Sequence, residues 1–277
     1  MENVNLLKRA KDLLRLYDIS PKKRLGQNFA VNSGMLQRFV SHASLTEDDV
    51  VLEVGPGFGF LTQFLSSKCK KVIAVEIDPQ LVRFLRTQLQ SLKNIELIEC
   101  DILKVSFPSF SKVVSAPPYS ISSPLLFRLL EQQFEQAVLI LQKEFAERLA
   151  ASVGTKDYGR LTVNIYYRAE VELLDIVPRT MFYPPPDVDS MMVRLKPRAP
   201  PFPVDDEETF FGIVKTLFTQ RNRKVRNGLI SFLHQQHGLT GKKAVELADS
   251  TIYSTKRVRE LSPEDFGILA DELFRKF

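Results

Sequence analysis

Short apolar runs recur along the first half of the chain and alternate with segments of helical spacing. Five runs of aliphatic, often β-branched residues occupy residues 50–54, 71–76, 95–100, 112–116 and 137–142. Such runs are typical of strands that a parallel sheet buries on both faces. The intervening segments 59–67, 79–91, 123–133 and 143–152 place apolar residues three or four positions apart, which predicts helices. The alternation predicts an α/β fold with helices on both faces of a parallel sheet.

In the second half of the chain, the alternation of strands and helices is interrupted by two proline-rich segments. Residues 170–177 and 188–195 predict two further strands, and the proline-rich segment VPRTMFYPPPD between them predicts a loop. A second proline-rich segment at residues 197–204 reads as a linker, and only helical patterns follow it. We therefore expect a first domain over residues 1–200 and a smaller helical domain over residues 201–277.

Composition narrows the class of protein. The 277 residues are 44% hydrophobic and 26% charged, which excludes a disordered or collagenous chain. No apolar run approaches the ~18 residues that cross a bilayer, and the N-terminus lacks the order of a signal peptide, so we expect a cytoplasmic protein without a membrane partner. Cys69, Cys100 and the three histidines show no metal-ligand spacing, so no metal is expected.

The charge is mildly basic but unevenly distributed. Lys and Arg number 38 against 33 Asp and Glu, for a formal net charge of +5. The basic residues gather in an N-terminal group and in a late group that contains no acid: Lys8, Arg9, Lys11, Arg15, Lys22, Lys23 and Arg24, then Lys215, Arg221, Arg223, Lys224 and Arg226. Two such clusters suggest a polyanionic partner. Two solvated helix faces would give the same pattern.

A glycine-rich loop, EVGPGFG at residues 53–59, directly follows the first predicted strand. Gly55 and Gly57 permit a tight turn and a close approach of backbone N–H groups to a ligand. Glu76 ends the second strand about 20 positions later, where an acid accepts hydrogen bonds from ribose hydroxyls. Asp101 follows the third strand and could accept one from an adenine amine. These features predict a cofactor that contains a nucleoside; the alternative is that both acids cap helices.

The fourth predicted strand ends in Ser115, Ala116, Pro117, Pro118 and Tyr119. The two prolines fix the backbone and leave the Pro117 carbonyl without a ladder partner. An exposed Tyr119 ring at this sheet edge could stack on a base that has left its helix. Taken alone, the motif is more typical of a proline turn with a tyrosine in the core.

Several motifs in order resemble one known family. They are KRLGQNF at 23–29, EVGPGFG, PPY followed by ISSP at 121–124, QKE at 142–144, FYPPP at 182–186 with Val188 and Ser190, and QRNRK at 220–224. From about residue 20 to its end, the chain resembles the ribosomal RNA adenine N6,N6-dimethyltransferases of the kasugamycin-resistance type.

The resemblance implies a class I S-adenosylmethionine-dependent methyltransferase, with a Rossmann-like, mostly parallel seven-stranded sheet and a small all-helical C-terminal domain. Such enzymes act in ribosome biogenesis and dimethylate two adjacent adenines in the 3′-terminal hairpin of small-subunit (16S) rRNA; we expect a monomer bound to the small ribosomal subunit. The resemblance implies that the cofactor is held by Asn28, Ala30, Gly55, Gly57, Glu76, Asp101 and Ala116.

The same resemblance assigns the substrate side. Tyr119 and Phe182 would sandwich the target adenine, with Ala116 and Pro117 beside its amine. We expect the RNA phosphates to contact Lys22, Lys23, Arg24, Arg221, Arg223, Lys224 and Arg226.

Three positions depart from the family's pattern: Ala30 is usually Leu, Asp187 is usually Lys, and Ala116 is usually Asn. The adenine amine is a poor nucleophile, because its lone pair is delocalised into the ring. Two carbonyl acceptors, the Asn side chain and the next backbone carbonyl, would draw its hydrogens out of plane. With Ala116, only Pro117 remains, and such a loss commonly costs about 10²–10³ in rate. Ser115 or a water is a possible substitute.

Ala116 therefore keeps a second hypothesis open, an RNA-binding ribosome assembly factor of the same fold with weak or lost catalysis. A DNA adenine methyltransferase could share the proline–tyrosine turn, but no separate DNA-reading insertion is apparent. An NAD-dependent dehydrogenase is the least favoured, because the glycine spacing differs from that of dinucleotide sites.

Overall fold

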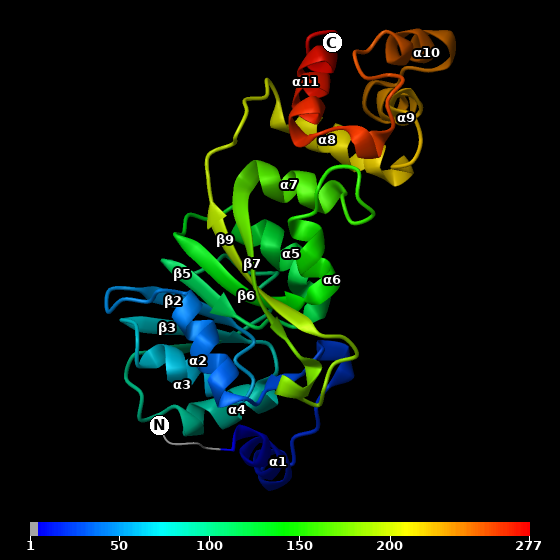
Figure 1. The fold of residues 1–277 in the computed structure, drawn as a ribbon. Helices are drawn as coiled ribbons and strands as arrows, with labels where there is room; N and C mark the ends of the chain where they lie inside the picture. The colour runs from blue at the N-terminus through cyan, green and yellow to red at the C-terminus, as the bar shows by residue number, and fades with distance from the viewer. Residues whose placement is uncertain (1–4) are drawn as a thin grey trace. The chain divides into compact units, whose positions relative to one another are not determined.

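The computed structural model describes residues 5–277, and seven strands between residues 50 and 197 build one sheet (Figure 1). The strand order is β4-β3-β2-β5-β6-β9-β7. Each predicted strand is confirmed to within two residues: β2 (Val50–Val54), β3 (Lys71–Glu76), β4 (Ile95–Glu99), β5 (Lys112–Ser115), β6 (Gln136–Gln142), β7 (Ala169–Val177) and β9 (Ser190–Pro197). Strands β2 to β6 are parallel, and β9 runs antiparallel to β6. The carboxyl ends of the parallel strands therefore meet at one edge.

Helices lie on both faces of this sheet, as the alternation predicted (Figure 1). After α1 (Leu6–Leu16) they are α2 (Ser33–His42), α3 (Phe60–Ser66), α4 (Pro79–Gln88), α5 (Ser122–Leu129) and α6 (Lys143–Leu149). Helix α4 begins after Asp78, whose side chain accepts a hydrogen bond from the Gln80 N–H, with Pro79 in the first turn. This start places Asp78 two residues beyond the end of β3.

Strand β4 corrects one prediction. It is not buried on both faces: Glu96 and Glu99 are exposed and the other three residues are half-buried. The reason is its place at the edge of the sheet, where only β3 pairs with it. The burial of a strand depends on its place in the sheet, and the apolar residues within the strand do not reveal that place.

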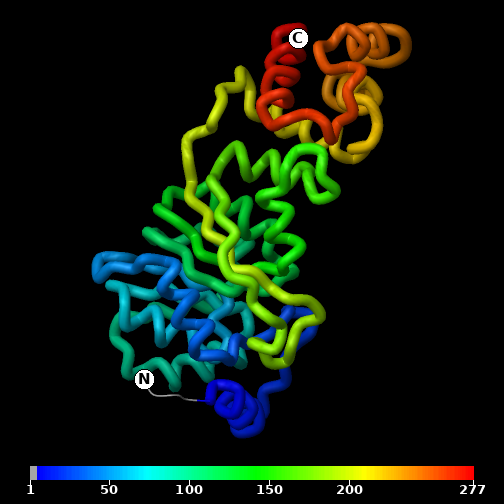
Figure 2. Tube along the Cα trace, viewed as in Figure 1, coloured from blue at the N-terminus to red at the C-terminus, as the bar shows by residue number. Residues whose placement is uncertain are grey.

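The segment predicted as a loop at 177–187 also differs. It contains a short strand, β8 (Phe182–Tyr183), which pairs antiparallel with β1 (Phe29–Ala30) in a separate two-stranded sheet. Figure 2 shows the blue N-terminal segment running beside this yellow-green one. The prolines flank the two residues rather than interrupt them, so the backbone N–H groups of β8 remain available for pairing. The pairing joins two of the predicted site motifs.

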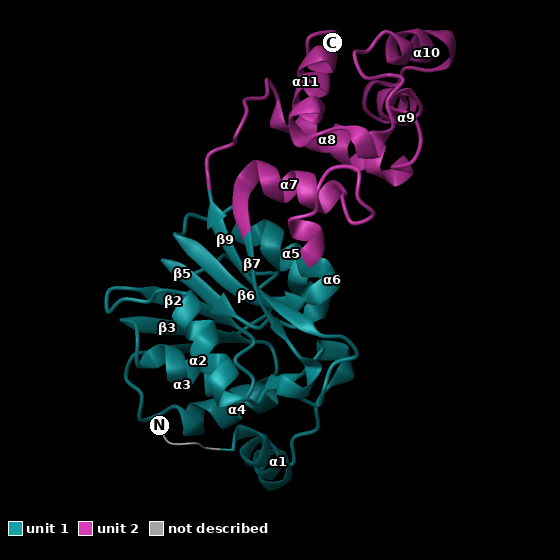
Figure 3. Cartoon of the chain, viewed as in Figure 1, with its two compact units in different colours: residues 1–146, 172–197 teal, residues 147–171, 198–277 magenta. Residues whose placement is uncertain are grey.

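The chain divides into two compact units (Figure 3). One ends at residue 146 and resumes over 172–197, and the other comprises residues 147–171 and 198–277. The expected boundary near residue 200 lies close to the last passage of the chain between the units, at residues 197–198, but residues 147–171 also belong to the helical unit. They do so because Tyr158 and the α7 (Arg160–Arg168) residues Val163 and Tyr167 are buried in its core.

The rest of this second unit is helical, as predicted. It contains α8 (Glu207–Leu217), α9 (Val225–His237), α10 (Gly241–Asp249) and α11 (Pro263–Phe274), with short 3₁₀ turns at Phe218–Gln220 and Val258–Glu260. Ser262 and Asp265 form the capping box that starts α11. Helices α8 and α9 approach closely at Gly228, where a Cβ atom would lie 2.4 Å from Leu217 Cδ2.

Candidate active site

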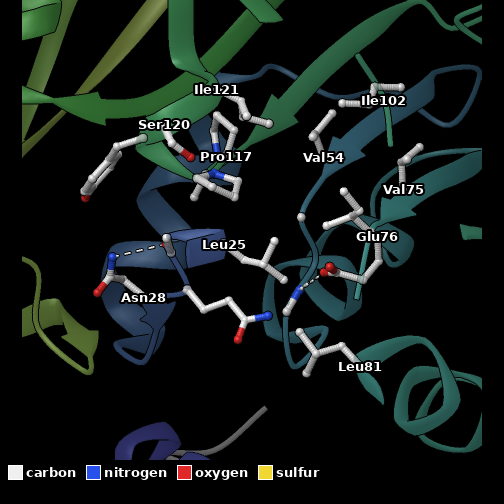
Figure 4. Close-up of a pocket in the computed structure, with 18 of the residues that line it drawn as sticks. Leu25, Asn28, Val54, Val75, Glu76, Leu81, Ile102, Pro117, Ser120 and Ile121 are labelled. Carbon is white, nitrogen blue, oxygen red and sulfur yellow. Dashed lines mark hydrogen bonds between the residues drawn. The ribbon is translucent and has the colours of Figure 1, made fainter. Parts of the chain in front are cut away.

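A pocket opens at the carboxyl ends of β2, β3 and β5, within the first unit (Figure 4). Its wall brings together the segments 24–29, 54–57, 75–77, 100–102 and 116–121. The residues predicted for the site that line it are Asn28, Gly55, Gly57, Glu76, Asp101, Ala116, Pro117, Tyr119 and Phe182. Ala30 lines a smaller adjoining pocket that shares Asn28, Gly57 and Ala116 with the first. Residues far apart in sequence therefore converge as the strand-end argument expects.

The glycine loop has the backbone that its sequence predicts. Gly55 and Gly57 have φ angles of +74° and +59°, in the left-handed region that favours glycine. A Cβ atom on Gly57 would lie 2.8 Å from Phe29 Cδ1, so a side chain there would force the aromatic ring aside. The Gly57 N–H donates to Glu76 Oε2 at 3.4 Å. The loop is thus turned toward the acid at the end of β3.

Glu76 is buried, with 5% of its surface exposed, and faces the pocket (Figure 4). Its Oε1 accepts the Asp78 N–H at 2.9 Å, and burial raises its pKa. It does not cap α4, because Asp78 does. Asp101 is different: its Oδ1 accepts the Leu103 N–H at 3.0 Å in a local turn. Both carboxyl groups keep acceptor capacity for a nucleoside.

Glu53, at the end of β2, was not singled out from the sequence. It is 1% exposed and lines the smaller pocket together with Asn28, Ala30 and Ala116. Its Oε2 has no hydrogen-bond partner among the described residues, and burial, with a smaller contribution from Glu76, raises its pKa to about 8. An unpartnered buried acceptor marks a place where a donor group of a ligand would be favourable.

The motif after β5 presents a backbone acceptor. No described residue donates a hydrogen bond to the Pro117 carbonyl. Ser115 is fully buried, and its hydroxyl donates to the Val54 carbonyl at 2.7 Å and accepts the Val54 N–H at 3.2 Å. Ser115 is therefore committed to the sheet and does not replace the missing Asn side chain at Ala116.

The two aromatic residues predicted to hold a base both line the pocket, but they are held differently. Tyr119 is half-buried, and its hydroxyl lies 2.5 Å from Ser190 Oγ, at the start of β9. Phe182 is 4% exposed and packs in the core of the first unit. Tyr119 is thus the more accessible ring, and Ser190 fixes its orientation, a role that the sequence did not indicate.

The N-terminal basic residues separate into two kinds. Lys22 forms an ion pair with the buried Asp78, with Nζ 2.6 Å from Oδ1. Lys23 and Arg24 are exposed, and Arg24 also lines the pocket.

The late basic residues separate in the same way. The Arg221 guanidinium donates to the backbone carbonyls of Thr155 and Lys156, and Arg226 pairs with Asp249 at 2.9 Å. The side chains of Arg223 and Lys224 are exposed and contact no described residue through a hydrogen bond or ion pair. Of the late residues predicted to contact phosphate, these two have side chains free to meet an anion.

Within residues 5–277, no group of three or more potential metal ligands occurs, and no helix is long and apolar enough to cross a membrane.

The loop, the strand-end acids and the proline turn form one cleft whose donor and acceptor groups fit S-adenosylmethionine. Glu76 and Asp101 suit the hydroxyls and amine of its nucleoside, and the turn at Gly55 and Gly57 lets the backbone approach it. The unpartnered Oε2 of Glu53 suits a hydrogen-bond donor such as an ammonium group.

Comparisons with known proteins identify the family of the chain. The model of the ribosomal RNA adenine dimethylase family matches residues 19–271. The curated "Probable ribosomal RNA small subunit methyltransferase A" of Methanosarcina acetivorans is 44% identical over 90% of this chain and 92% of its own. The protein of the same name from Thermococcus kodakarensis is 42% identical over 94% and 92%.

Solved structures agree as well. The dimethyladenosine transferase of Plasmodium falciparum is 29% identical, with a TM-score of 0.75 over 90% of this chain and 98% of its own. The 23S rRNA methyltransferase ErmE is 31% identical, with a TM-score of 0.66 over 89% and 100%. The chain belongs to the ribosomal RNA adenine dimethylase family, and it is an S-adenosylmethionine-dependent rRNA adenine methyltransferase.

Proposed function

We propose that this enzyme transfers methyl groups from S-adenosylmethionine to the N6 amines of two adjacent adenines in the 3′-terminal hairpin of 16S rRNA. It acts in the cytoplasm on the small ribosomal subunit, as a monomer without a metal. One observation carries the proposal: the strand-end acids Glu76 and Asp101 line one pocket together with Pro117 and Tyr119. The names of the similar archaeal proteins support the small-subunit substrate.

The cofactor supplies an electrophilic methyl group on a positively charged sulfur. When it is bound, Glu76 would accept hydrogen bonds from the ribose and Asp101 from the cofactor adenine, while Asn28 and Ala30 would border the methionine end. Tyr119 and Phe182 hold the target base after it leaves its stack. The Pro117 carbonyl accepts one hydrogen of the target amine and turns its lone pair toward the methyl group. This positioning of the two reacting groups contributes to the rate enhancement.

The second hypothesis, an assembly factor without catalysis, rests on Ala116 alone. The relatives reported above are all named as transferases, which does not favour it. The likeness to ErmE, which acts on 23S rRNA by its title, leaves a large-subunit substrate as the candidate to be tested against ours.

The test is methyl transfer from labelled S-adenosylmethionine to unmethylated small subunits, large subunits and duplex DNA in parallel. We expect label in small subunits only, recovered by mass spectrometry as N6,N6-dimethyladenine in the 3′-terminal hairpin. Label in large subunits or in DNA would show that those molecules, and not small subunits, are the substrate. Absence of label from all three, with cofactor bound, would favour the assembly factor.

A further inference from the structure

Asp78 lies at the centre of a buried hydrogen-bond network beside the cofactor pocket. The residue is 1% exposed. Its Oδ1 accepts Lys22 Nζ at 2.6 Å and the Gln80 N–H at 3.1 Å, and its Oδ2 accepts Gln27 Nε2 at 2.9 Å. Capping α4 needs only one of these three bonds. The other two tie the N-terminal loop to the end of β3, across more than 50 residues of sequence.

Gln27 also joins the two ends of the loop formed by residues 22–27. Its Oε1 accepts the Lys22 N–H at 2.8 Å while its amide nitrogen donates to Asp78. The segment between Lys22 and Gln27 turns through Gly26, which has a φ of +61°. Residues 24–28 of this closed loop line the cofactor pocket.

The same Asp78 also orients the acid that faces the ribose. Its backbone N–H donates to Glu76 Oε1 at 2.9 Å, and Glu76 keeps its Oε2 on the Gly57 N–H. One residue therefore connects the wall of the pocket to its nucleoside-binding carboxyl group. We therefore expect a change in the Lys22–Asp78 pair to alter the position of both the loop 22–28 and the Glu76 carboxyl group.

We propose that Lys22, Gln27 and Asp78 form a latch that holds residues 22–28 against the cofactor pocket and so positions the loop for S-adenosylmethionine. This rests on the proposed function only in taking the pocket as the cofactor site. Lys22 is then a positioning residue of the cofactor site and not a phosphate contact, unlike its neighbour Lys23, whose side chain is exposed and unpaired among the described residues.

The physical reason is the burial of Asp78. A carboxylate out of water needs its hydrogen-bond donors, and removal of one leaves part of its charge uncompensated. Without the Lys22 ammonium the loop loses its charged anchor, and open positions of the loop become populated. Binding of the cofactor must then select the closed position, which lowers its apparent affinity.

The experiment compares neighbouring lysines in the full-length protein. Cofactor affinity is measured by calorimetry without RNA, and RNA affinity is measured as a function of salt. We expect Lys22→Met to weaken S-adenosylmethionine binding about tenfold and Lys22→Arg to restore most of it. Lys22→Met keeps the wild-type salt slope of RNA binding, whereas Lys23→Met lowers that slope by about 0.7–0.9 and keeps cofactor affinity.

A second variant distinguishes loss of the latch from a general folding defect. Asp78→Asn keeps an N-cap for α4 but removes the charge that Lys22 meets, so we expect a similar loss of cofactor affinity and no additivity with Lys22→Met. Wild-type cofactor affinity in both single variants, or a salt slope lowered in Lys22→Met as in Lys23→Met, would overturn the latch. Failure of the wild-type protein to bind S-adenosylmethionine would instead overturn the assignment of the pocket.

Discussion

Ala116 stands where the family usually has Asn, beside the Pro117 carbonyl, to which no described residue donates a hydrogen bond. Since Ser115 is committed to β2, the target amine meets one carbonyl, that of Pro117. We predict that Ala116→Asn raises kcat for methyl transfer by about 10²–10³. Single-turnover kinetics on unmethylated small subunits measure this, and an unchanged rate would show that another group supplies the second acceptor.

Tyr119 permits a second prediction at this scale. Removal of the ring in Tyr119→Ala loses base stacking of about 1–3 kcal/mol, which corresponds to a decrease of roughly five- to 150-fold in kcat/KM. Tyr119→Phe keeps the ring but loses the bond to Ser190, so its decrease is expected to be smaller, about 2–12-fold. Ser190→Ala should match Tyr119→Phe. Equal losses in Tyr119→Ala and Tyr119→Phe would contradict a stacking role.

Glu53 makes the stability of the protein depend on pH. Burial raises its pKa from an ordinary value of 4.5 to about 8, so the folded chain keeps this proton over an interval in which the unfolded chain has lost it. The contribution of Glu53 to stability is therefore full below pH 4.5 and is lost as the pH rises to about 8. Between pH 5 and pH 8 we predict that the free energy of unfolding falls less in Glu53→Gln than in wild type, as measured by urea titration. Parallel pH profiles would rule out a protonated Glu53.

At the scale of elements, the seven strands and the C-terminal helices could be predicted from apolar spacing and caps, because those signals are local. The edge position of β4 and the pairing of β8 with β1 could not, because each depends on a partner far along the chain. The same holds for α7, whose apolar face would also suit a helix that packs on the sheet. Its place in the second unit follows from the burial of Val163 and Tyr167 in that unit's core.

Gly228 sets the spacing of α8 and α9. Ala is about 1 kcal/mol better than Gly within a helix, but its Cβ would lie 2.4 Å from Leu217 Cδ2 and 3.3 Å from Leu217 Cα. Overpacking of this kind costs about 1–3 kcal/mol, so we predict that Gly228→Ala is destabilising by up to about 2 kcal/mol. Gln236→Ala, exposed on the same helix, is the control and should stay within about 0.5 kcal/mol of wild type. A Gly228→Ala protein more stable than wild type would contradict the close packing.

At the scale of the whole molecule, the number of basic residues in the two clusters overestimates the number of side chains that are free to contact RNA. Of the predicted phosphate contacts, Arg221 and Arg226 are engaged within the second unit. We predict that loss of both Arg223 and Lys224 lowers the slope of log Kd against log salt by about 1.4–1.8, whereas Arg226→Ala lowers it less. Filter binding of 16S rRNA at several salt concentrations measures the slope for each variant. An equal decrease per cation removed would mean that the ion pair between Arg226 and Asp249 breaks when RNA binds.

The candidate site was largely predictable because its residues follow strand ends, and strand ends of a parallel sheet share one edge. Glu76, Asp101 and Tyr119 were found in this way. Glu53 and Asp78 were missed, since their importance comes from burial and from partners that the folded chain brings to them.

The most direct measurement of the central claim is a crystal structure of the protein with S-adenosylmethionine bound. We predict that the ribose hydroxyls contact Glu76, that the adenine amine contacts Asp101, and that the sulfonium methyl group faces the space between the Pro117 carbonyl and the Tyr119 ring. A cofactor bound elsewhere, or a methyl group directed away from Pro117 and Tyr119, would contradict the account.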